Sequence, residues 1–307
     1  MPAYIIRRLF QSIIVLITIS VIVFSLTFLS GDPAVLMVSP EATAEDVERF
    51  REQAGFNDPI LVQYSRFFSD AIRGDFGTSL RHNQPSLPLV IERLPATLQL
   101  SLFAIFLTVI IAIPLGVIAA WNRGSWIDNF AMGFAVFGQS VPNFWLGIML
   151  IFFFAVRLHV LPTSGRGGFR FLILPGMAMA FNLMAAITRL VRSTMLDVLS
   201  QDYIRTAHGK GLSSRGVMVK HGLRNALIPV VTVVALQFGY ILGGAVVIET
   251  VFSWPGIGLL TIQAIYNRDF PLVQAAVFVL AVFIILINLG VDIMYPYLDP
   301  RIRIDEQ

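Results

Sequence analysis

Long uncharged stretches alternate along the chain with short segments that carry most of the charged residues. Six of the uncharged stretches are long enough to cross a membrane: 9–31, 94–122, 129–156, 171–188, 225–248 and 270–291. A helix spans roughly 30 Å of hydrocarbon with about 20 mainly apolar residues. The pattern therefore predicts an all-α polytopic membrane protein with six transmembrane helices.

Basic residues predict how these spans are oriented. If the amino terminus lies in the cytoplasm, Arg7, Arg8, the basic cluster within 189–224, Arg301 and Arg303 all lie inside, and the short outer loops hold few basic residues. The first span is longer than the apolar core of a cleaved secretory signal. We therefore expect a retained first helix and both termini in the cytoplasm.

The spans divide the chain into four segments. Residues 1–29 are the amino terminus and the first helix, 30–96 a small external subdomain, 97–295 a five-helix core, and 296–307 a C-terminal tail. The core contains a long inner loop at 192–224.

Within the external subdomain the sequence predicts two helices. An exposed helix is expected over 41–53, capped by Thr43 or Ser39. An amphipathic helix over 62–72 is expected at the membrane surface. A purely solvated connector is the alternative for this subdomain.

The uncharged run 250–267 is predicted not to form a seventh span. Its segment Ser253-Trp254-Pro255-Gly256 breaks a helix, and a seventh crossing would carry the basic C-terminal tail outside. We expect a short re-entrant or surface hairpin on the outer face, with the Trp254 ring at the level of the lipid headgroups.

Composition removes several classes of function. The chain has no cysteine, which excludes disulfides and thiolate metal sites, and its formal net charge of +3 is too small and dispersed for nucleic-acid binding. Its four histidines form no H-E-x-x-H pair, and no G-x-S-x-G elbow occurs. We therefore expect no catalytic residue, no metal site and no cofactor bound by this chain.

The sequence also limits the energy source of any transport. The phosphate-binding pattern G-x-x-x-x-G-K-[ST] is absent; the nearest string, Gly209-Lys210-Gly211, lacks both the first glycine and the final hydroxyl. Nucleotide hydrolysis would therefore have to come from another polypeptide.

The middles of the six stretches carry neutral amides instead of ionisable side chains. Proton relays use buried Asp, Glu or His, so an ion-coupled secondary transporter is disfavoured, although sodium sites built from carbonyl groups leave it open. A non-transporting membrane scaffold is a further alternative.

The inner loop is the most unusual segment. It carries the strings Tyr203-Ile204-Arg205-Thr206-Ala207-His208-Gly209-Lys210-Gly211-Leu212 and His221-Gly222-Leu223-Arg224-Asn225-Ala226-Leu227-Ile228-Pro229. Alternating polar and apolar residues predict two short helices hinged at Gly209 and Gly211, and we expect one small apolar face made by Leu196, Leu199, Tyr203 and Ile204.

Residues 205–211 resemble the coupling loop of bacterial ABC importer permeases, whose motif is E-A-A, three residues and glycine. Arg205 stands where that motif has glutamate, as in the dipeptide, oligopeptide and nickel branch, where the strings are similar to Y-I-R-T-A-x-x-K-G-L and H-x-L-R-N-A-x-x-P. Strings at 31–33, 74–77, 93–98, 252–256 and 268–269 resemble further landmarks of that branch, in the same order.

The resemblance implies a type I ABC importer permease core, with residues 30–96 as a periplasmic subdomain, in the bacterial inner membrane. It implies a homologous second permease, two cytoplasmic ABC ATPases that bind ATP and Mg, and a periplasmic or lipid-anchored solute-binding protein. The implied solutes are di- or oligopeptides, including glutathione-like peptides. Nickel or another small solute is the alternative.

The resemblance and the chemistry of the side chains together give four sets of candidate residues. Contact with the ATPases is expected of Tyr203, Arg205, Thr206, Ala207 and Gly211, with small Ala207 letting the helix enter a groove. Gln139, Asn143, Asn182 and Gln237 are candidates for lining the pathway, or for bridging neighbouring helices. Ser253, Trp254, Pro255 and Gly256 are expected to face the binding protein or gate the pathway, and Gly239, Gly243 and Gly244 to pack against the second permease.

Overall fold

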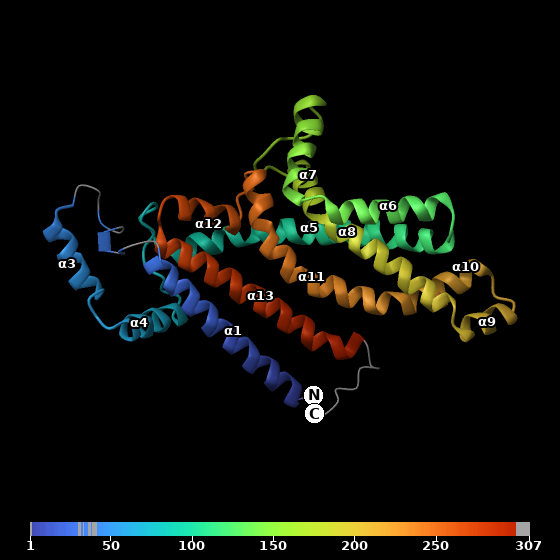
Figure 1. The fold of residues 1–307 in the computed structure, drawn as a ribbon, viewed down its shortest axis with the longest axis horizontal. Helices are drawn as coiled ribbons and strands as arrows, with labels where there is room; N and C mark the ends of the chain where they lie inside the picture. Colours follow the sequence, from blue (N-terminus) through green and yellow to red (C-terminus); the bar gives the residue numbers. More distant parts are fainter. Residues whose placement is uncertain (1, 30–31, 33, 36–37, 39–41, 299–307) are drawn as a thin grey trace. The chain divides into compact units, whose positions relative to one another are not determined.

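A computed structural model describes residues 2–29, 32, 34–35, 38 and 42–298 (Figure 1). Helices dominate this part of the chain: α1 (Pro2–Leu29), α3 (Ala44–Ala54), α4 (Ile60–Ile72), α5 (Ser86–Trp121), α6 (Trp126–Ser140), α7 (Asn143–Leu150), α8 (Phe169–Leu199), α9 (Asp202–Gly209), α10 (Ser214–Gly216), α11 (Arg224–Val251), α12 (Ile257–Tyr266) and α13 (Phe270–Leu298). Two π-helical segments, η1 (Ile151–Arg157) and η2 (Val217–Leu223), continue α7 and precede α11. The all-α class is confirmed.

Five helices among the described residues are long and apolar enough to cross a membrane, and a sixth crossing is reached if a bent pair counts as one span. That pair is α6 with α7–η1, which meet at 104°. The expectation of one continuous span over 129–156 is therefore wrong. Val141 adopts an extended conformation before Pro142, as residues before proline do, and the helix ends there.

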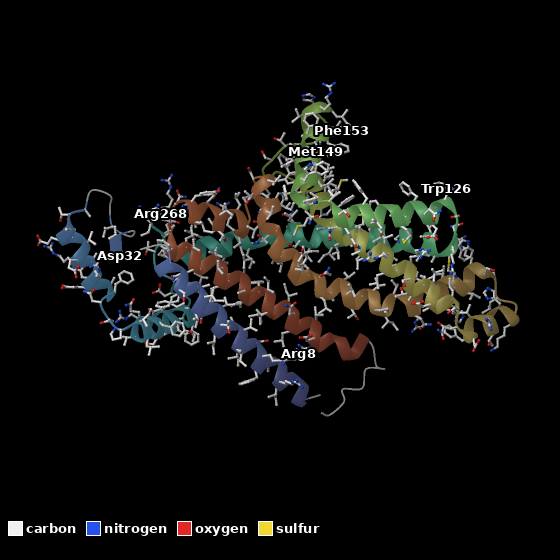
Figure 2. The ribbon with its side chains drawn as sticks, viewed as in Figure 1. Arg8, Asp32, Trp126, Met149, Phe153 and Arg268 are labelled. Carbon is white, nitrogen blue, oxygen red and sulfur yellow. The ribbon has the colours of Figure 1, made fainter. Side chains whose placement is uncertain are left out.

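Beyond this bend, α7 and η1 carry many exposed apolar side chains, including Met149 and Phe153 (Figure 2). Apolar side chains exposed along a whole helix are expected where lipid or another apolar helix replaces water. The short helix α12 falls below the length of a span, which confirms that 250–267 does not make a seventh crossing.

The described residues divide into two compact units, the first from Met1–Thr97 and Pro255–Leu289, the second from Leu98–Trp254 and Gly290–Gln307. In the first unit α1 contacts α4, where the hydroxyls of Ser20 and Tyr64 are 2.8 Å apart. Both helices expected in the external subdomain are present as α3 and α4.

Thr43 caps α3, as one of the two expected alternatives; Ser39 lies outside the described residues. The hydroxyl of Thr43 accepts the backbone N–H of Asp46, and the Asp46 carboxylate accepts the backbone N–H of Thr43. The Thr43 hydroxyl also donates to that carboxylate, and these bonds lower the pKa of Asp46 below its usual value.

In the second unit α8 is the central helix, packed against α6, α7 and α11. Gly138 of α6 allows a close approach to α8: a Cβ atom at this position would lie 2.6 Å from the Cβ of Ala185. The face of α6 that carries Gly138 thus packs directly on α8, which places the bend of the third span against the middle of α8.

Candidate functional site: the elbow and the polar bend

The inner loop is shorter than the sequence indicates. Helix α8 continues to Leu199, and the residues from Ser214 through η2 run without interruption into α11, so the second expected short helix is the beginning of a membrane span. We call residues 200–213, with α9 at their centre, the elbow. Gly211 has a φ of +80°, a left-handed conformation that favours glycine, and this single residue turns the chain after α9.

One face of α9 is buried against neighbouring segments of the same chain. Ile204 and Ala207 form a core with Val217 of η2, and Leu199 packs against it. Ala207 is only 7% exposed because it belongs to this core; that its small size lets the helix enter a groove of a partner stays a prediction. Of the residues expected to form an apolar face, Leu199 and Ile204 pack into this core, whereas Tyr203 is exposed.

The opposite face of α9 is exposed and polar. Arg205 is 82% exposed at its side chain and lies 3.6 Å from Asp202, and Thr206 is also exposed. The Tyr203 hydroxyl accepts a hydrogen bond of 3.1 Å from Nδ2 of Asn225 in α11. The buried core and this bond join α9 to the helical segment that continues into α11.

The second group of candidate residues meets at the bend of α6 and α7. Asn143 of α7, Asn182 of α8 and Gln237 of α11 line one small cavity of about 30 Å³ together with Tyr240 and Gly244. Asn182 donates from Nδ2 to the carbonyls of Gly138 and Gln139, at 3.4 and 3.3 Å, near the end of α6. Gln139 does not line the cavity.

Two polar atoms at the bend have no partner within the described residues. The Nε2 atom of Gln139 and the Oδ1 atom of Asn143 are buried and make no hydrogen bond. A buried donor or acceptor left unsatisfied costs about 1–3 kcal/mol, and water is scarce at membrane depth. The free acceptor belongs to Asn143, which lines the cavity, whereas the free donor belongs to Gln139, which does not. A cavity of about 30 Å³ has room for about one water molecule, with which the Asn143 oxygen could bond.

Sequence reasoning missed Tyr240, which is 73% exposed and lines the same cavity. It lies three residues after Gln237 on α11, so helical spacing was the signal that could have found it.

The hairpin after α11 is more buried than the sequence predicts. Trp254 is 1% exposed, so the expectation of a ring at the headgroup level is wrong. The guanidinium carbon of Arg166 lies 5.8 Å from the centre of this ring, and the backbone N–H of Gly165 donates to the Phe252 carbonyl. Ser253 is exposed with a φ of +47°, Pro255 is half-buried and Gly256 buried. Tertiary packing of the indole outweighs its preference for the interface.

The glycines of α11 divide between two environments. Gly239 is buried within this chain, so it does not face another subunit as expected. Gly243 and Gly244 are exposed, with no atom within 4 Å of an added Cβ. Their packing against a second permease stays a prediction.

A helical membrane protein with a polar bend in one span and an exposed elbow between two others has the elements expected of a transport permease. The chain is a member of the family of inner-membrane components of binding-protein-dependent transport systems, whose family model matches residues 112–304; the model of the N-terminal part of such components matches residues 1–101. The family is one of transport permeases and not of enzymes.

Relatives extend over nearly the whole chain. It is 42% identical to the dipeptide transport system permease protein DppB of Alkalihalophilus pseudofirmus, over 99% of this chain and 100% of that one. It is also 42% identical to the glutathione transport system permease protein GsiC of Escherichia coli, over 98% of both chains. The resemblance to the peptide branch of ABC importer permeases is confirmed.

Two solved structures share the fold. One is an inward-facing MetNI methionine ABC transporter, with a TM-score of 0.55 and 19% identity over 69% of this chain and 96% of that one. The other is an amino acid ABC transporter with histidines, with a TM-score of 0.51 and 16% identity over 70% of this chain and 94% of that one. The type I importer permease fold is thereby confirmed.

Proposed function

We propose that this chain is one of two permease subunits of an ATP-driven importer of di- or oligopeptides, including glutathione-like peptides. One observation carries the proposal: Asn143, Asn182 and Gln237, from three helices, line a single cavity at a bend in a membrane span. Amides can hydrogen-bond a peptide backbone without bringing charge into hydrocarbon. The relatives named for dipeptides and glutathione support the same solute class.

The elbow is proposed to contact a cytoplasmic ABC ATPase that binds ATP and Mg. Tyr203, Arg205 and Thr206 provide the contact, because they lie on the exposed face of α9. Ala207 and Gly211 serve inside the elbow, the first by packing on Val217 and the second by its backbone conformation. On this proposal the elbow and both termini lie in the cytoplasm, and the subdomain over residues 30–96 lies in the periplasm, where a free or lipid-anchored solute-binding protein would dock.

The mechanism follows from how the elbow is attached. Its ends are the last turn of α8 and the continuous segment from Ser214 to Val251. Closure of the ATPases on ATP would push α9, and the rigid connections would pass the motion to α8 and α11, which both line the polar cavity. The unsatisfied amides at the α6–α7 bend would gain partners when the pathway opens to a peptide.

Uptake into proteoliposomes tests the proposal. The complex of this chain with its second permease and ATPases should accumulate a radiolabelled dipeptide only with ATP inside and the binding protein outside. Asn182→Leu should reduce uptake at least severalfold, whereas Ser140→Ala, an exposed hydroxyl bonded to its own helix, should not. Accumulation of nickel instead of peptide would move the chain to the alternative branch, and uptake driven by an ion gradient without ATP would overturn the proposal.

A further inference from the structure

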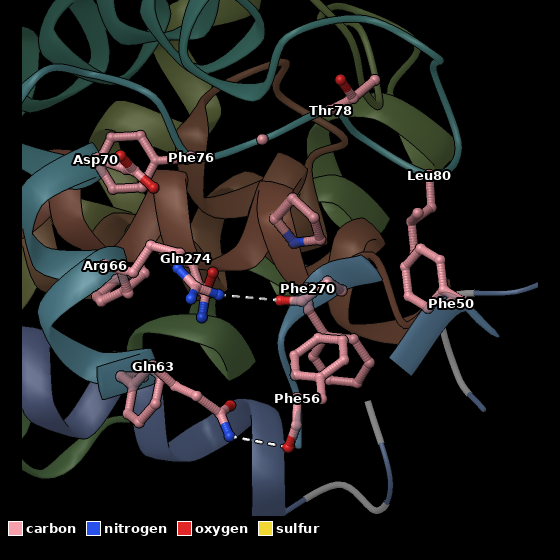
Figure 3. A pocket seen from close by; sticks show the side chains of 15 residues that line it. Phe50, Phe56, Gln63, Arg66, Asp70, Phe76, Thr78, Leu80, Phe270 and Gln274 are labelled. Carbon is pink, nitrogen blue, oxygen red and sulfur yellow. Dashed lines mark hydrogen bonds between the residues drawn. The ribbon is translucent and has the colours of Figure 1, made fainter. Parts of the chain in front are cut away.

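The first unit contains a cavity that the proposed function does not use. It has a volume of about 420 Å³ and lies among α1, α3, α4, the segment 76–80 and the start of α13 (Figure 3). Phenylalanine is the commonest residue type in its lining: Phe24, Phe50, Phe56, Phe67, Phe76 and Phe270. The rings of Phe24 and Phe67 are 5.7 Å apart, and those of Phe50 and Phe56 6.2 Å apart. The cavity therefore offers several aromatic surfaces to one ligand.

Helix α4 supplies the polar side of the cavity. Gln63, Arg66, Phe67 and Asp70 all line it, at the spacing that places residues on one helical face. The amide nitrogen of Gln63 already has partners within the chain, because Nε2 donates to the carbonyls of Phe56 and Asp58 at 2.9 and 2.8 Å. Arg66 has a partner as well, since its Nη2 lies 2.7 Å from the Asp58 carboxylate.

Asp70 is different from its neighbours. It follows Arg66 by four residues, the spacing of a helical ion pair, but Arg66 is turned toward Asp58. In the described parts of the chain the Asp70 carboxylate has no hydrogen bond and no ion pair, and its side chain is only half-buried. The charge of Arg66 is neutralised by Asp58, so the cavity retains one uncompensated negative charge among aromatic rings.

We propose that this cavity binds a primary ammonium group carried on an apolar stem, with Asp70 as the counter-ion. Carboxylate and ammonium form a charge-assisted hydrogen bond, and the faces of phenyl rings attract a cation. The remaining rings bury the stem. Two sources have this chemistry: the amino terminus of a short peptide and the lysine side chain of a docking protein. The inference stands on the cavity alone and does not require the proposed function.

Calorimetry on the complete transporter in nanodiscs, with empty nanodiscs as the blank, tests the chemistry. Three probes share one butyl stem: n-butylammonium, 1-butanol and pentanoate. The ammonium should bind at least about tenfold more tightly than the other two, and added salt should weaken it. Equal binding of the three probes to the unmodified chain would overturn the proposal, without reference to any variant.

Variants then assign the contacts. Asp70→Asn, which keeps the shape of the side chain, should weaken the binding of n-butylammonium about tenfold and leave the binding of 1-butanol unchanged. Phe67→Leu should weaken the ammonium severalfold, because it retains apolar volume but removes the ring. Glu52→Gln, which neutralises an exposed acid outside the cavity, should leave the affinities for n-butylammonium and 1-butanol unchanged. An ammonium affinity that is the same in Asp70→Asn would contradict the role of Asp70.

Competition identifies the source. Displacement of n-butylammonium by Leu-Leu but not by N-acetyl-Leu-Leu would indicate a peptide amino terminus. Displacement by N-acetyl-lysine methylamide but not by Leu-Leu would indicate a lysine of a docking protein. Failure of both to displace the probe would overturn the inference, and none of these results depends on whether the chain imports peptides.

Discussion

The guanidinium of Arg192 in α8 holds the carboxylate of Asp128 in α6 through two bonds, Nε to Oδ1 at 2.5 Å and Nη2 to Oδ2 at 2.7 Å. Asp128 is 3% exposed at its side chain and also accepts the backbone N–H of Gly124 at 2.9 Å. The pair lies about two turns of α8 before the elbow. It therefore fixes the first turn of α6 to the end of α8 that carries the elbow.

Removing one partner of this pair should destabilise the chain. Asp128→Asn leaves a largely buried guanidinium without its counter-ion, and we expect a loss of about 3 kcal/mol in the free energy of unfolding. Asp202→Asn is the control, because its pair with Arg205 is 3.6 Å long and exposed on both sides. Thermal unfolding of the two variants in one detergent measures the difference. Equal melting temperatures would show that the Asp128 pair contributes nothing.

The turn after α9 should depend on glycine at one position and not at its neighbour. Gly211→Ala forces a side chain into a left-handed backbone and should cost about 1 kcal/mol locally. Gly209→Ala lies in the last turn of α9, with open space around the new methyl group. We expect fewer peptides imported per ATP hydrolysed for Gly211→Ala and an unchanged ratio for Gly209→Ala. The same ratio in both variants would remove the turn from the coupling mechanism.

Close packing of α6 on α8 should tolerate no methyl group at Gly138. An alanine there would bring two Cβ atoms within 2.6 Å, and overpacking of this kind costs about 1–3 kcal/mol. Gly133→Ala on the same helix meets open space and should be neutral. Melting temperatures compare the two variants. Because the Gly138 carbonyl accepts from Asn182, uptake should fall only in Gly138→Ala.

Acid should loosen the start of α3. The pKa of Asp46 is lowered in the folded chain by its bonds to Thr43, so the stability that these bonds add is present above the unfolded pKa of about 3.8 and is lost as pH falls through the lower folded value. Hydrogen exchange of the first amides of α3 should accelerate in this range. In Thr43→Ala the exchange should already be fast at neutral pH, and a pH response of the same size would contradict the assignment.

Local signals account for the parts of the structure that the sequence predicted. Uncharged stretches predicted the spans, and the preference of threonine and serine for the start of a helix predicted a cap of α3 at Thr43 or Ser39, of which Thr43 is confirmed. The glycines after α9 predicted a hinge at Gly209 and Gly211; Gly211 does turn the chain, whereas Gly209 is the last residue of α9. Three of the four amides selected from mid-membrane positions, Asn143, Asn182 and Gln237, line one cavity. Asn182 also bonds α8 to α6, as the alternative of amides that bridge neighbouring helices predicts, so a role in lining the pathway stays a prediction.

Tertiary relationships account for what the sequence did not predict. Hydropathy measures the length of an apolar stretch and not its direction, so it did not predict the 104° bend at Pro142 within residues 129–156. Polar residues such as Lys220 and His221 resembled a loop, although they belong to a helix continuous with α11. The burial of Ala207 and Trp254 depends on Val217 and on packing by distant segments, which no local pattern encodes.

Cross-linking tests whether the elbow contacts a cytoplasmic ABC ATPase. The chain has no cysteine, so Arg205→Cys gives a single probe on the exposed face of α9, and Glu45→Cys on α3 is a control of similar exposure. A thiol-reactive photocross-linker is attached to each variant in the assembled transporter. We expect an ATPase adduct from position 205 and none from position 45. An adduct from position 45, or no ATPase adduct from position 205, would contradict it.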